Sequence, residues 1–200
     1  MVGSRFVKAV ERACDWHDGQ VRKGTGVPYV SHLLAVASLV LEAGGDEEQA
    51  IAAMLHDAVE DRPDLASPEA IREEFGDRVA DIVVECSDRP HGVEGTPENW
   101  RARKEAYVRS LSSASRDALL VSCADKLHNA RSLLRDLVQE KEAVWDRFNQ
   151  TDPAEQLWYY RALAEAFAER IRQPAWLPEE LHRTVEDIAA RSAATRSRSL

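Results

Sequence analysis

The sequence reads Met54-Leu55-His56-Asp57-Ala58-Val59-Glu60-Asp61 in the first third of the chain. On a helix of about 100° per residue, Ile51, Leu55 and Val59 form an apolar face, and the histidine and the acids fall on the opposite face. The segment 51–61 contains no lysine or arginine, so its acids would repel one another on an isolated helix. A metal cation bound among them would remove this repulsion. A histidine next to an aspartate is also a common solvated surface feature, so the rest of the chain has to decide between the two interpretations.

The composition sets the class of protein. The chain has 200 residues, of which 44% are hydrophobic, and this is enough for one domain with a sizeable core. It contains no apolar run of about 18 residues that could cross a membrane, and its first residues lack the apolar core of a signal peptide. Cys14, Cys86 and Cys123 stand far apart, which predicts three small buried residues in a reducing cytoplasm and no disulfide.

The charge narrows the choice of partners. The formal net charge of −9 argues against non-specific binding of nucleic acid, which needs a basic surface. We also expect no membrane contact. An acidic protein can still bind an anionic small molecule, but only through a local cluster of arginine and lysine or through a metal ion.

Hydrophobic periodicity indicates the fold class. Apolar residues recur at helical spacing through most of the chain, and no segment alternates in the manner of a strand. Ser31, Ser67 and Ser115 precede such segments and are expected to cap them. There is no internal repeat, no GxGxxG sequence and no P-loop. The sequence therefore predicts an all-α fold in a single compact helical bundle.

Two polar segments separate the predicted helices. Residues 19–29 are basic and rich in glycine, and they form either a solvated loop or a rim that closes on an anion. In the second case, the guanidinium of Arg22 could stack on a flat base. Residues 87–99 form a longer loop with two prolines and two glycines, long enough to be disordered or to act as a lid.

Four side chains from three predicted helices could form one metal site, namely His32, His56, Asp57 and Asp125. Taken alone, His32 is a histidine in the first turn of an apolar helix, and Asp125 could pair with a neighbouring lysine or arginine. Together, two imidazoles and two carboxylates form a ligand set that suits Mn, Fe or Zn. Glu60 and Asp61 follow one helical turn later and could orient or deprotonate an attacking water.

Four short motifs follow one another within residues 5–135. They are Arg22-Lys23-Gly24 with Pro28-Tyr29 and His32, then His56-Asp57-Ala58-Val59-Glu60-Asp61, then Phe75-Gly76, and then Ala124-Asp125-Lys126-Leu127-His128-Asn129. In this order the motifs resemble the hydrolase domain of the Rel/Spo alarmone enzymes, a branch of the HD superfamily of metal-dependent phosphohydrolases. The resemblance implies an HD-domain helical bundle that removes the 3′-pyrophosphate of guanosine tetra- or pentaphosphate. The products would be GDP or GTP and pyrophosphate.

The resemblance also implies roles for particular residues in the metal site. The expected manganese ligands are His32, His56, Asp57 and Asp125. Glu60 and Asp61 match the acidic pair of the family that activates the attacking water.

The substrate contacts are likewise implied by the resemblance. Arg22 matches a residue that stacks on the guanine, Lys23 one that faces the phosphates, and Asn129 one that holds the sugar-phosphate part. Lys126 and Arg131 would complete the local basic cluster that the net charge requires. The expected partner is thus a nucleotide, and the oligomeric state is left open.

Some features depart from the long members of the family. No synthetase domain follows, which predicts a small stand-alone hydrolase with its catalytic domain in residues 1–175 and a C-terminal helix and frayed tail in residues 176–200. Ser87-Asp88-Arg89-Pro90 and Trp158-Tyr159-Tyr160 also differ from the long enzymes. Two alternatives therefore stay open, namely an HD phosphohydrolase that acts on another phosphorylated nucleotide and a non-catalytic module that binds metal and nucleotide.

Overall fold

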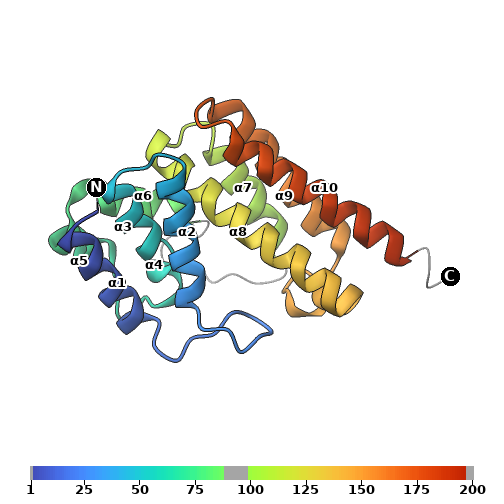
Figure 1. The fold of residues 1–200 in the computed structure, drawn as a ribbon, viewed down its shortest axis with the longest axis horizontal. Coiled ribbons are helices and arrows are strands. Elements are labelled where there is room, and N and C mark those ends of the chain that lie inside the picture. The colour runs from blue at the N-terminus through green and yellow to red at the C-terminus, as the bar shows by residue number, and fades with distance from the viewer. Residues whose placement is uncertain (1, 88–98, 197–200) are drawn as a thin grey trace. The chain divides into compact units, whose positions relative to one another are not determined.

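The computed structural model describes residues 2–87 and 99–196, and most of the predicted 87–99 loop lies outside these ranges. In chain order the helices are α1 (Ser4–Trp16), α2 (Val30–Glu42), α3 (Glu47–Leu55), α4 (Ala58–Asp61), α5 (Pro68–Phe75), α6 (Asp77–Cys86), α7 (Trp100–Ser110), α8 (Arg116–Glu140), the 3-10 helix η1 (Lys141–Arg147), α9 (Pro153–Arg170) and α10 (Trp176–Arg196) (Figure 1). Within the described ranges the only β-type pairing is an isolated bridge between Val21 and Pro28. The predicted all-α fold is confirmed.

The chain divides into two compact units. Unit 1 comprises residues 1–90 and 114–125, and unit 2 comprises residues 91–113 and 126–200. Helix α8 contributes its first part to unit 1 and the remainder to unit 2. No helix of the described residues combines the length and the apolar character needed to span a membrane.

Helix α3 is the central element of unit 1. It contacts α1, α2 and α6, and every residue from Ala50 to Leu55 is fully buried. The sequence predicted burial on one face only. The alanines at positions 50, 52 and 53 present little bulk, so the neighbouring helices can pack against the other sides as well.

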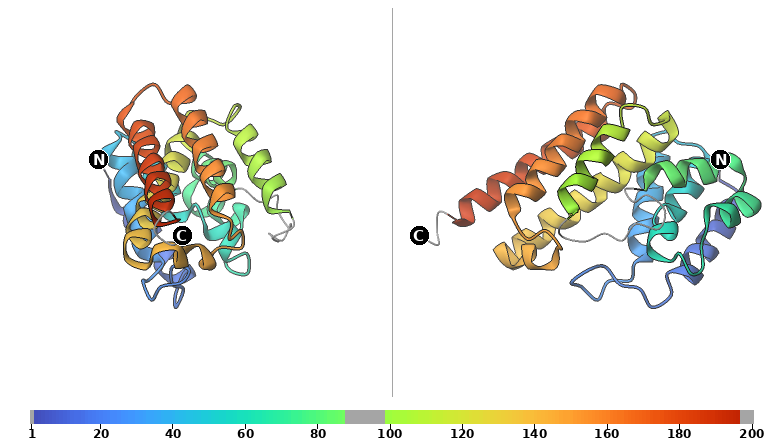
Figure 2. Two further views of the ribbon diagram at one scale, coloured as in Figure 1. Left: turned by 90° about the vertical axis from the view of Figure 1, so that its right-hand side faces the viewer. Right: turned by 180° about the vertical axis from the view of Figure 1, so that it is seen from behind.

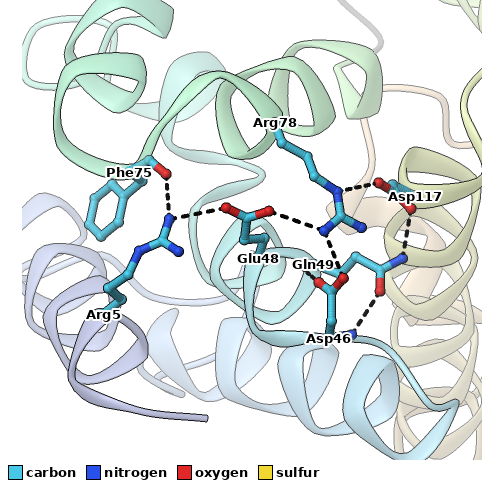
Figure 3. Close-up of polar contacts among 7 residues, drawn as sticks. All are labelled: Arg5, Asp46, Glu48, Gln49, Phe75, Arg78 and Asp117. Carbon is cyan, nitrogen blue, oxygen red and sulfur yellow. Dashed lines mark hydrogen bonds and ion pairs between the residues drawn. The ribbon is translucent and has the colours of Figure 1, made fainter. Parts of the chain in front are cut away.

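The N-terminal end of α3 is fixed by caps and ion pairs. The carboxylate of Asp46 accepts from the backbone amide of Gln49, whose side chain accepts in return from the amide of Asp46, which is a capping box. Arg78 of α6 contacts Asp46 at 2.7 Å, Glu48 at 3.1 Å and Asp117 of α8 at 2.7 Å. Figure 3 shows how Arg78 lies between these three carboxylates. One guanidinium thereby ties α3 to α6 and α8.

The C-terminal end of α3 differs from the prediction. The sequence suggested one continuous helix through Asp61, but α3 ends at Leu55 and the four-residue α4 begins only at Ala58. The ring nitrogen Nδ1 of His56 lies 2.9 Å from the carbonyl oxygen of Ala53. In an uninterrupted helix, that carbonyl would accept from the amide of Asp57. The histidine side chain therefore takes the place of a helical hydrogen bond at the turn between α3 and α4.

Two further local predictions were wrong and two were confirmed. Cys14 is exposed because it lies outside the buried face of α1, which carries Ala9, Ala13 and Trp16. Ser31 is not an N-cap, since α2 begins at Val30 and has no side-chain cap. The hydroxyls of Ser67 and Ser115 accept from backbone amides three residues later, as expected of caps.

Unit 2 contains α7, η1, α9 and α10. Helix α9 lies alongside α10 and also contacts α7 (Figure 2). The apolar stripe of α10 is fully buried at Leu177, Leu181, Val185 and Ile188. This helix is longer than the predicted segment near residues 178–190. The boundary at residues 175 and 176 stays a prediction.

Candidate metal centre

The four predicted metal ligands lie together in unit 1. His32 comes from the first turn of α2, His56 and Asp57 from the turn between α3 and α4, and Asp125 from α8. Oδ2 of Asp57 lies 3.4 Å from Nε2 of His32 and 3.0 Å from Nε2 of His56. Oδ1 of Asp125 lies 3.2 Å from Nε2 of His32 and 3.7 Å from Nε2 of His56. The ligand atoms of His32, His56 and Asp57 all fall within 4.8 Å of one another.

The hydrogen bond of His56 sets which of its nitrogens faces the site. Nδ1 must carry a proton to donate to the carbonyl of Ala53, so in the neutral ring the lone pair is on Nε2. Nε2 is buried and has no hydrogen-bond partner among the described residues. A lone pair beside carboxylate oxygens is repulsive unless a cation lies between them. Metal-binding histidines are commonly oriented by such a bond through the second nitrogen, so the residues fit a divalent metal.

The electrostatics of the cluster also favour positive charge. Burial lowers the pKa of His56, but the carboxylates of Asp57 and Asp125 outweigh it and raise that pKa well above its usual value. Burial raises the pKa of Asp57, and the two imidazoles outweigh it and hold that pKa well below its usual value. The cluster thus stabilises the ionised carboxylate of Asp57, which can face a cation.

Tyr29, which is not itself a predicted ligand, holds the carboxylate of Asp57. Its hydroxyl donates to Oδ2 of Asp57 at 2.6 Å. Burial, followed by the charges of Asp57 and Asp61, raises the pKa of Tyr29 far above its usual value. The phenol therefore stays protonated and remains a hydrogen-bond donor to Asp57.

The acidic pair expected to act on water lies on α4. The hydroxyl of Ser87 donates to Oε1 of Glu60 at 2.5 Å, and the amide of Gln20 donates to Oδ2 of Asp61 at 2.8 Å. The backbone amide of Asp61 donates to the carbonyl of Asp57 at 2.9 Å. Each carboxylate is thus held by a polar side chain from another segment.

The predicted substrate residues fall in two segments. Arg22 and Lys23 lie in the loop between α1 and α2, and the guanidinium carbon of Arg22 is 5.7 Å from the ring centroid of Tyr29.

Lys126, Asn129 and Arg131 follow Asp125 along α8. The ammonium of Lys126 is 5.3 Å from the ring centroid of Tyr107, and Asn129 is half-buried. Arg131 forms a 2.5 Å ion pair with Glu180 of α10, so its charge is already met by a carboxylate. A role for it in binding substrate stays a prediction.

Sequence reasoning did not anticipate the supporting side chains. The motif that contains Tyr29 predicts no role for its hydroxyl, and the sequence places Gln20 and Ser87 in loops without a predicted contact. Their partners lie far along the chain, 28 residues away for Tyr29, 41 for Gln20 and 27 for Ser87. No local spacing indicates such pairs.

A comparison with protein families identifies the fold. The family model described as "HD domain" matches residues 9–154, which include all four predicted ligands. The chain belongs to the HD-domain family. The family and the His/Asp cluster together support a divalent metal site.

Among curated proteins, this HD-domain chain is similar to alarmone enzymes. It is 38% identical to the guanosine-3′,5′-bis(diphosphate) 3′-pyrophosphohydrolase of Haemophilus influenzae over 128 residues. The matched region covers 60% of this chain and 17% of the relative. It is 35% identical to the bifunctional (p)ppGpp synthase/hydrolase SpoT of Escherichia coli K12 over 134 residues. That region covers 64% of this chain and 18% of the relative. The chain spans less than a fifth of the length of these relatives. The expected family resemblance is confirmed.

Solved structures give a match over nearly the whole chain. One is a metazoan protein described as an ortholog of SpoT that hydrolyzes ppGpp, with a TM-score of 0.71 and 26% identity over 95% of this chain and 96% of the other. Another, from Listeria monocytogenes EGD-e, has a TM-score of 0.67 and 30% identity over 82% of this chain and 99% of the other.

Proposed function

We propose that this HD-domain chain is a metal-dependent phosphohydrolase that removes the 3′-pyrophosphate of guanosine tetra- or pentaphosphate. The observation that carries the proposal is the buried cluster of His32, His56, Asp57 and Asp125, with Glu60 and Asp61 beside it on α4. Support comes from the similarity to a structure described as hydrolysing ppGpp, which extends over 96% of that structure's chain. The products would be GDP or GTP and pyrophosphate.

The metal that we propose is Mn²⁺. Two imidazole nitrogens and two carboxylate oxygens form a mixed set, and manganese accepts both kinds of ligand. When bound, the ion would act as a Lewis acid and lower the pKa of a nearby water. The bond from His56 to Ala53 and the bond from Tyr29 to Asp57 would hold two of the ligands in place.

The remaining chemistry falls to the acidic pair. We assign Glu60 or Asp61 as the group that takes a proton from water while the water oxygen attacks the 3′-linked phosphorus. The bond between that phosphorus and the ribose 3′ oxygen breaks, the 3′ oxygen takes up a proton, and pyrophosphate leaves. Ser87 and Gln20 restrict the rotation of the two carboxylates, and fixed geometry is what proton transfer requires.

The proposed substrate contacts supply the local positive charge that an acidic protein needs. Arg22 would stack on the guanine and Lys23 would face the phosphates, both from the loop between α1 and α2. Lys126 and Asn129 would add contacts from α8. Arg131 is already paired with Glu180, so a phosphate bound by Arg131 would share its guanidinium with that carboxylate.

The test is release of pyrophosphate from guanosine tetraphosphate by the purified chain. We expect release with added Mn²⁺, one GDP for each pyrophosphate, and none with EDTA. If the chain binds Mn²⁺ but releases no pyrophosphate, guanosine tetraphosphate is not its substrate. Hydrolysis of another phosphorylated nucleotide from a panel would then indicate a different phosphohydrolase. Binding of nucleotides without hydrolysis would indicate a non-catalytic module.

The variant Glu60→Gln separates binding from chemistry. It keeps the size of the side chain and one oxygen that can accept from Ser87, but it removes the base. We expect Mn²⁺ binding to persist and turnover to fall by roughly 10²–10⁴, the usual contribution of general acid–base catalysis. Unchanged turnover would move the base role to Asp61.

A further inference from the structure

Two side chains with no assigned role connect the end of α1 to the acidic pair. His17 directly follows α1 and is only 4% exposed. Its Nδ1 lies 2.7 Å from Oε1 of Gln20, and Nε2 of Gln20 lies 2.8 Å from Oδ2 of Asp61. The three side chains form a continuous chain of hydrogen bonds within unit 1.

The chemistry of the partners fixes the direction of each bond. An ionised carboxylate can only accept, so the group of Gln20 that faces Asp61 is its amino group. The carbonyl oxygen of Gln20 then faces His17, and Nδ1 of His17 must carry a proton to donate to it. The remaining nitrogen, Nε2, is buried and has no hydrogen-bond partner among the described residues. The network therefore requires a proton on Nδ1 of His17.

His17 also supports the neighbouring ligand. Its ring stacks on the ring of Tyr29, with centroids 5.1 Å apart and an interplanar angle of 19°. Tyr29 in turn donates to Asp57. One imidazole thus contacts the supports of both Asp57 and Asp61.

The need for such support follows from the size of α4. This helix has four residues, and isolated helices of that length are not stable by themselves. Asp61 is its last residue and is followed by a break at Pro63. A carboxylate at that position needs a contact from another segment to hold its orientation.

We propose that His17 and Gln20 are positioning residues that hold the carboxylate of Asp61 for proton transfer. The proposal rests on the hydrolysis proposed above, in which Asp61 belongs to the acidic pair. His17 acts only through Gln20 and does not contact substrate or metal in this scheme. The competing explanation is that His17 merely fills space next to Tyr29, and this would require its ring but not its Nδ1 proton.

A pair of substitutions at position 17 separates donor from ring. His17→Phe keeps a ring that can stack on Tyr29 but removes the donor to Gln20. His17→Asn places an amide nitrogen as many bonds from the backbone as Nδ1, and it loses the ring. Gln20→Met removes the link to Asp61 at similar volume. Gln156→Met is the control, because it removes a glutamine far from the acidic pair in sequence, which is buried and whose amide donates to the backbone carbonyl of Gln150.

The measurements are kcat and KM for guanosine tetraphosphate with Mn²⁺, and Mn²⁺ affinity by electron paramagnetic resonance without nucleotide. We expect His17→Phe and Gln20→Met to lower kcat by roughly 10- to 100-fold, the usual effect of losing an outer hydrogen-bond partner. KM and Mn²⁺ affinity should stay near the wild-type values. His17→Asn should recover most of kcat, and Gln156→Met should leave kcat unchanged. Wild-type kcat in His17→Phe, or no recovery in His17→Asn, would overturn the proposal.

A second readout does not depend on turnover. Nitrogen-15 NMR of the histidine rings reports which ring nitrogen carries the proton, and His17→Phe assigns the signal. We expect the tautomer protonated at Nδ1 in the wild-type chain. The tautomer protonated at Nε2 would overturn the network even if the enzyme is active. An inactive wild-type chain with the expected tautomer would contradict the proposed hydrolysis but leave the hydrogen-bond network standing.

Discussion

At its N-terminal end, α3 collects acidic groups around an arginine, whereas at its C-terminal end it collects them around two histidines. At the N-terminal end, Arg78 contacts three carboxylates at 2.7–3.1 Å, and its own side chain is 41% exposed. At the other end, Asp57 contacts Tyr29, His32 and His56, and both imidazoles are buried. One helix therefore carries two charge clusters of different kinds.

The difference separates stability from function. The carboxylates around Arg78, one exposed and two half-buried, already have a fixed cationic partner, and such ion pairs stabilise the fold only a little. At the C-terminal end, the half-buried Asp57 and the buried Asp125 face two buried imidazoles, and two imidazoles with two carboxylates form a ligand set that suits a divalent metal ion. We therefore expect substitutions at the N-terminal end to change stability, and substitutions at the C-terminal end to change metal binding and turnover.

The largest effect is expected from Asp57→Ala at the C-terminal end. It removes a carboxylate that faces both imidazoles, so Mn²⁺ binding and turnover should be lost together. Isothermal titration with Mn²⁺ measures the binding, and pyrophosphate release measures the turnover. The chain should remain folded but lose some stability, because Asp57 contacts Tyr29 and both imidazoles.

Asp46→Asn at the opposite end of the same helix is the matched control for Asp57→Ala. It also neutralises one aspartate, yet it should bind Mn²⁺ and turn over like the wild type. If Asp57→Ala retained the full metal stoichiometry, Asp57 would not be a ligand. If Asp46→Asn lost metal as well, the two ends of α3 would not be independent.

A smaller effect, on stability alone, is expected from Arg78→Met. The substitution keeps much of the aliphatic stem but leaves Asp46, Glu48 and Asp117 without their shared cation. Exposed ion pairs contribute about 0.2–1 kcal/mol each, so the loss of these three pairs should lower the free energy of unfolding by about 0.6–3 kcal/mol. Urea unfolding in EDTA measures this fall. A change in kcat of the folded variant would contradict the separation of the two ends.

The sequence was sufficient for the fold class and for the four clustered side chains. Helical periodicity predicted the all-α fold. The order of the motifs predicted that one metal site contains His32, His56, Asp57 and Asp125. Both depend on spacing along the chain, which the sequence displays directly.

The break at His56 and the supports of the carboxylates were not predictable in this way. The side chain of His56 bonds to the carbonyl of Ala53 at the point where α3 ends, and an average rotation per residue contains no information about such a bond. Tyr29 and Gln20 reach their partners through contacts 28 and 41 residues apart. Such contacts depend on how the helices pack. Exposure of Cys14 was missed because α1 buries the face that carries Ala9 and Ala13.

The smallest effect is the pH dependence that Asp46 adds at the N-terminal end. Burial raises the pKa of Asp46, but the amide of Gln49 and the guanidinium of Arg78 outweigh it and lower that pKa below its usual value. A lowered pKa stabilises the fold above the unfolded value of about 3.9, and this stabilisation is lost as the pH falls through the folded pKa. Asparagine caps a helix about as well as aspartate, so Asp46→Asn isolates the charge. Urea unfolding should show Asp46→Asn less stable than the wild type by about 0.2–1 kcal/mol at pH 7, with the difference shrinking in acid. A difference that does not change with pH would mean that Asp46 stabilises α3 through its cap and not through Arg78.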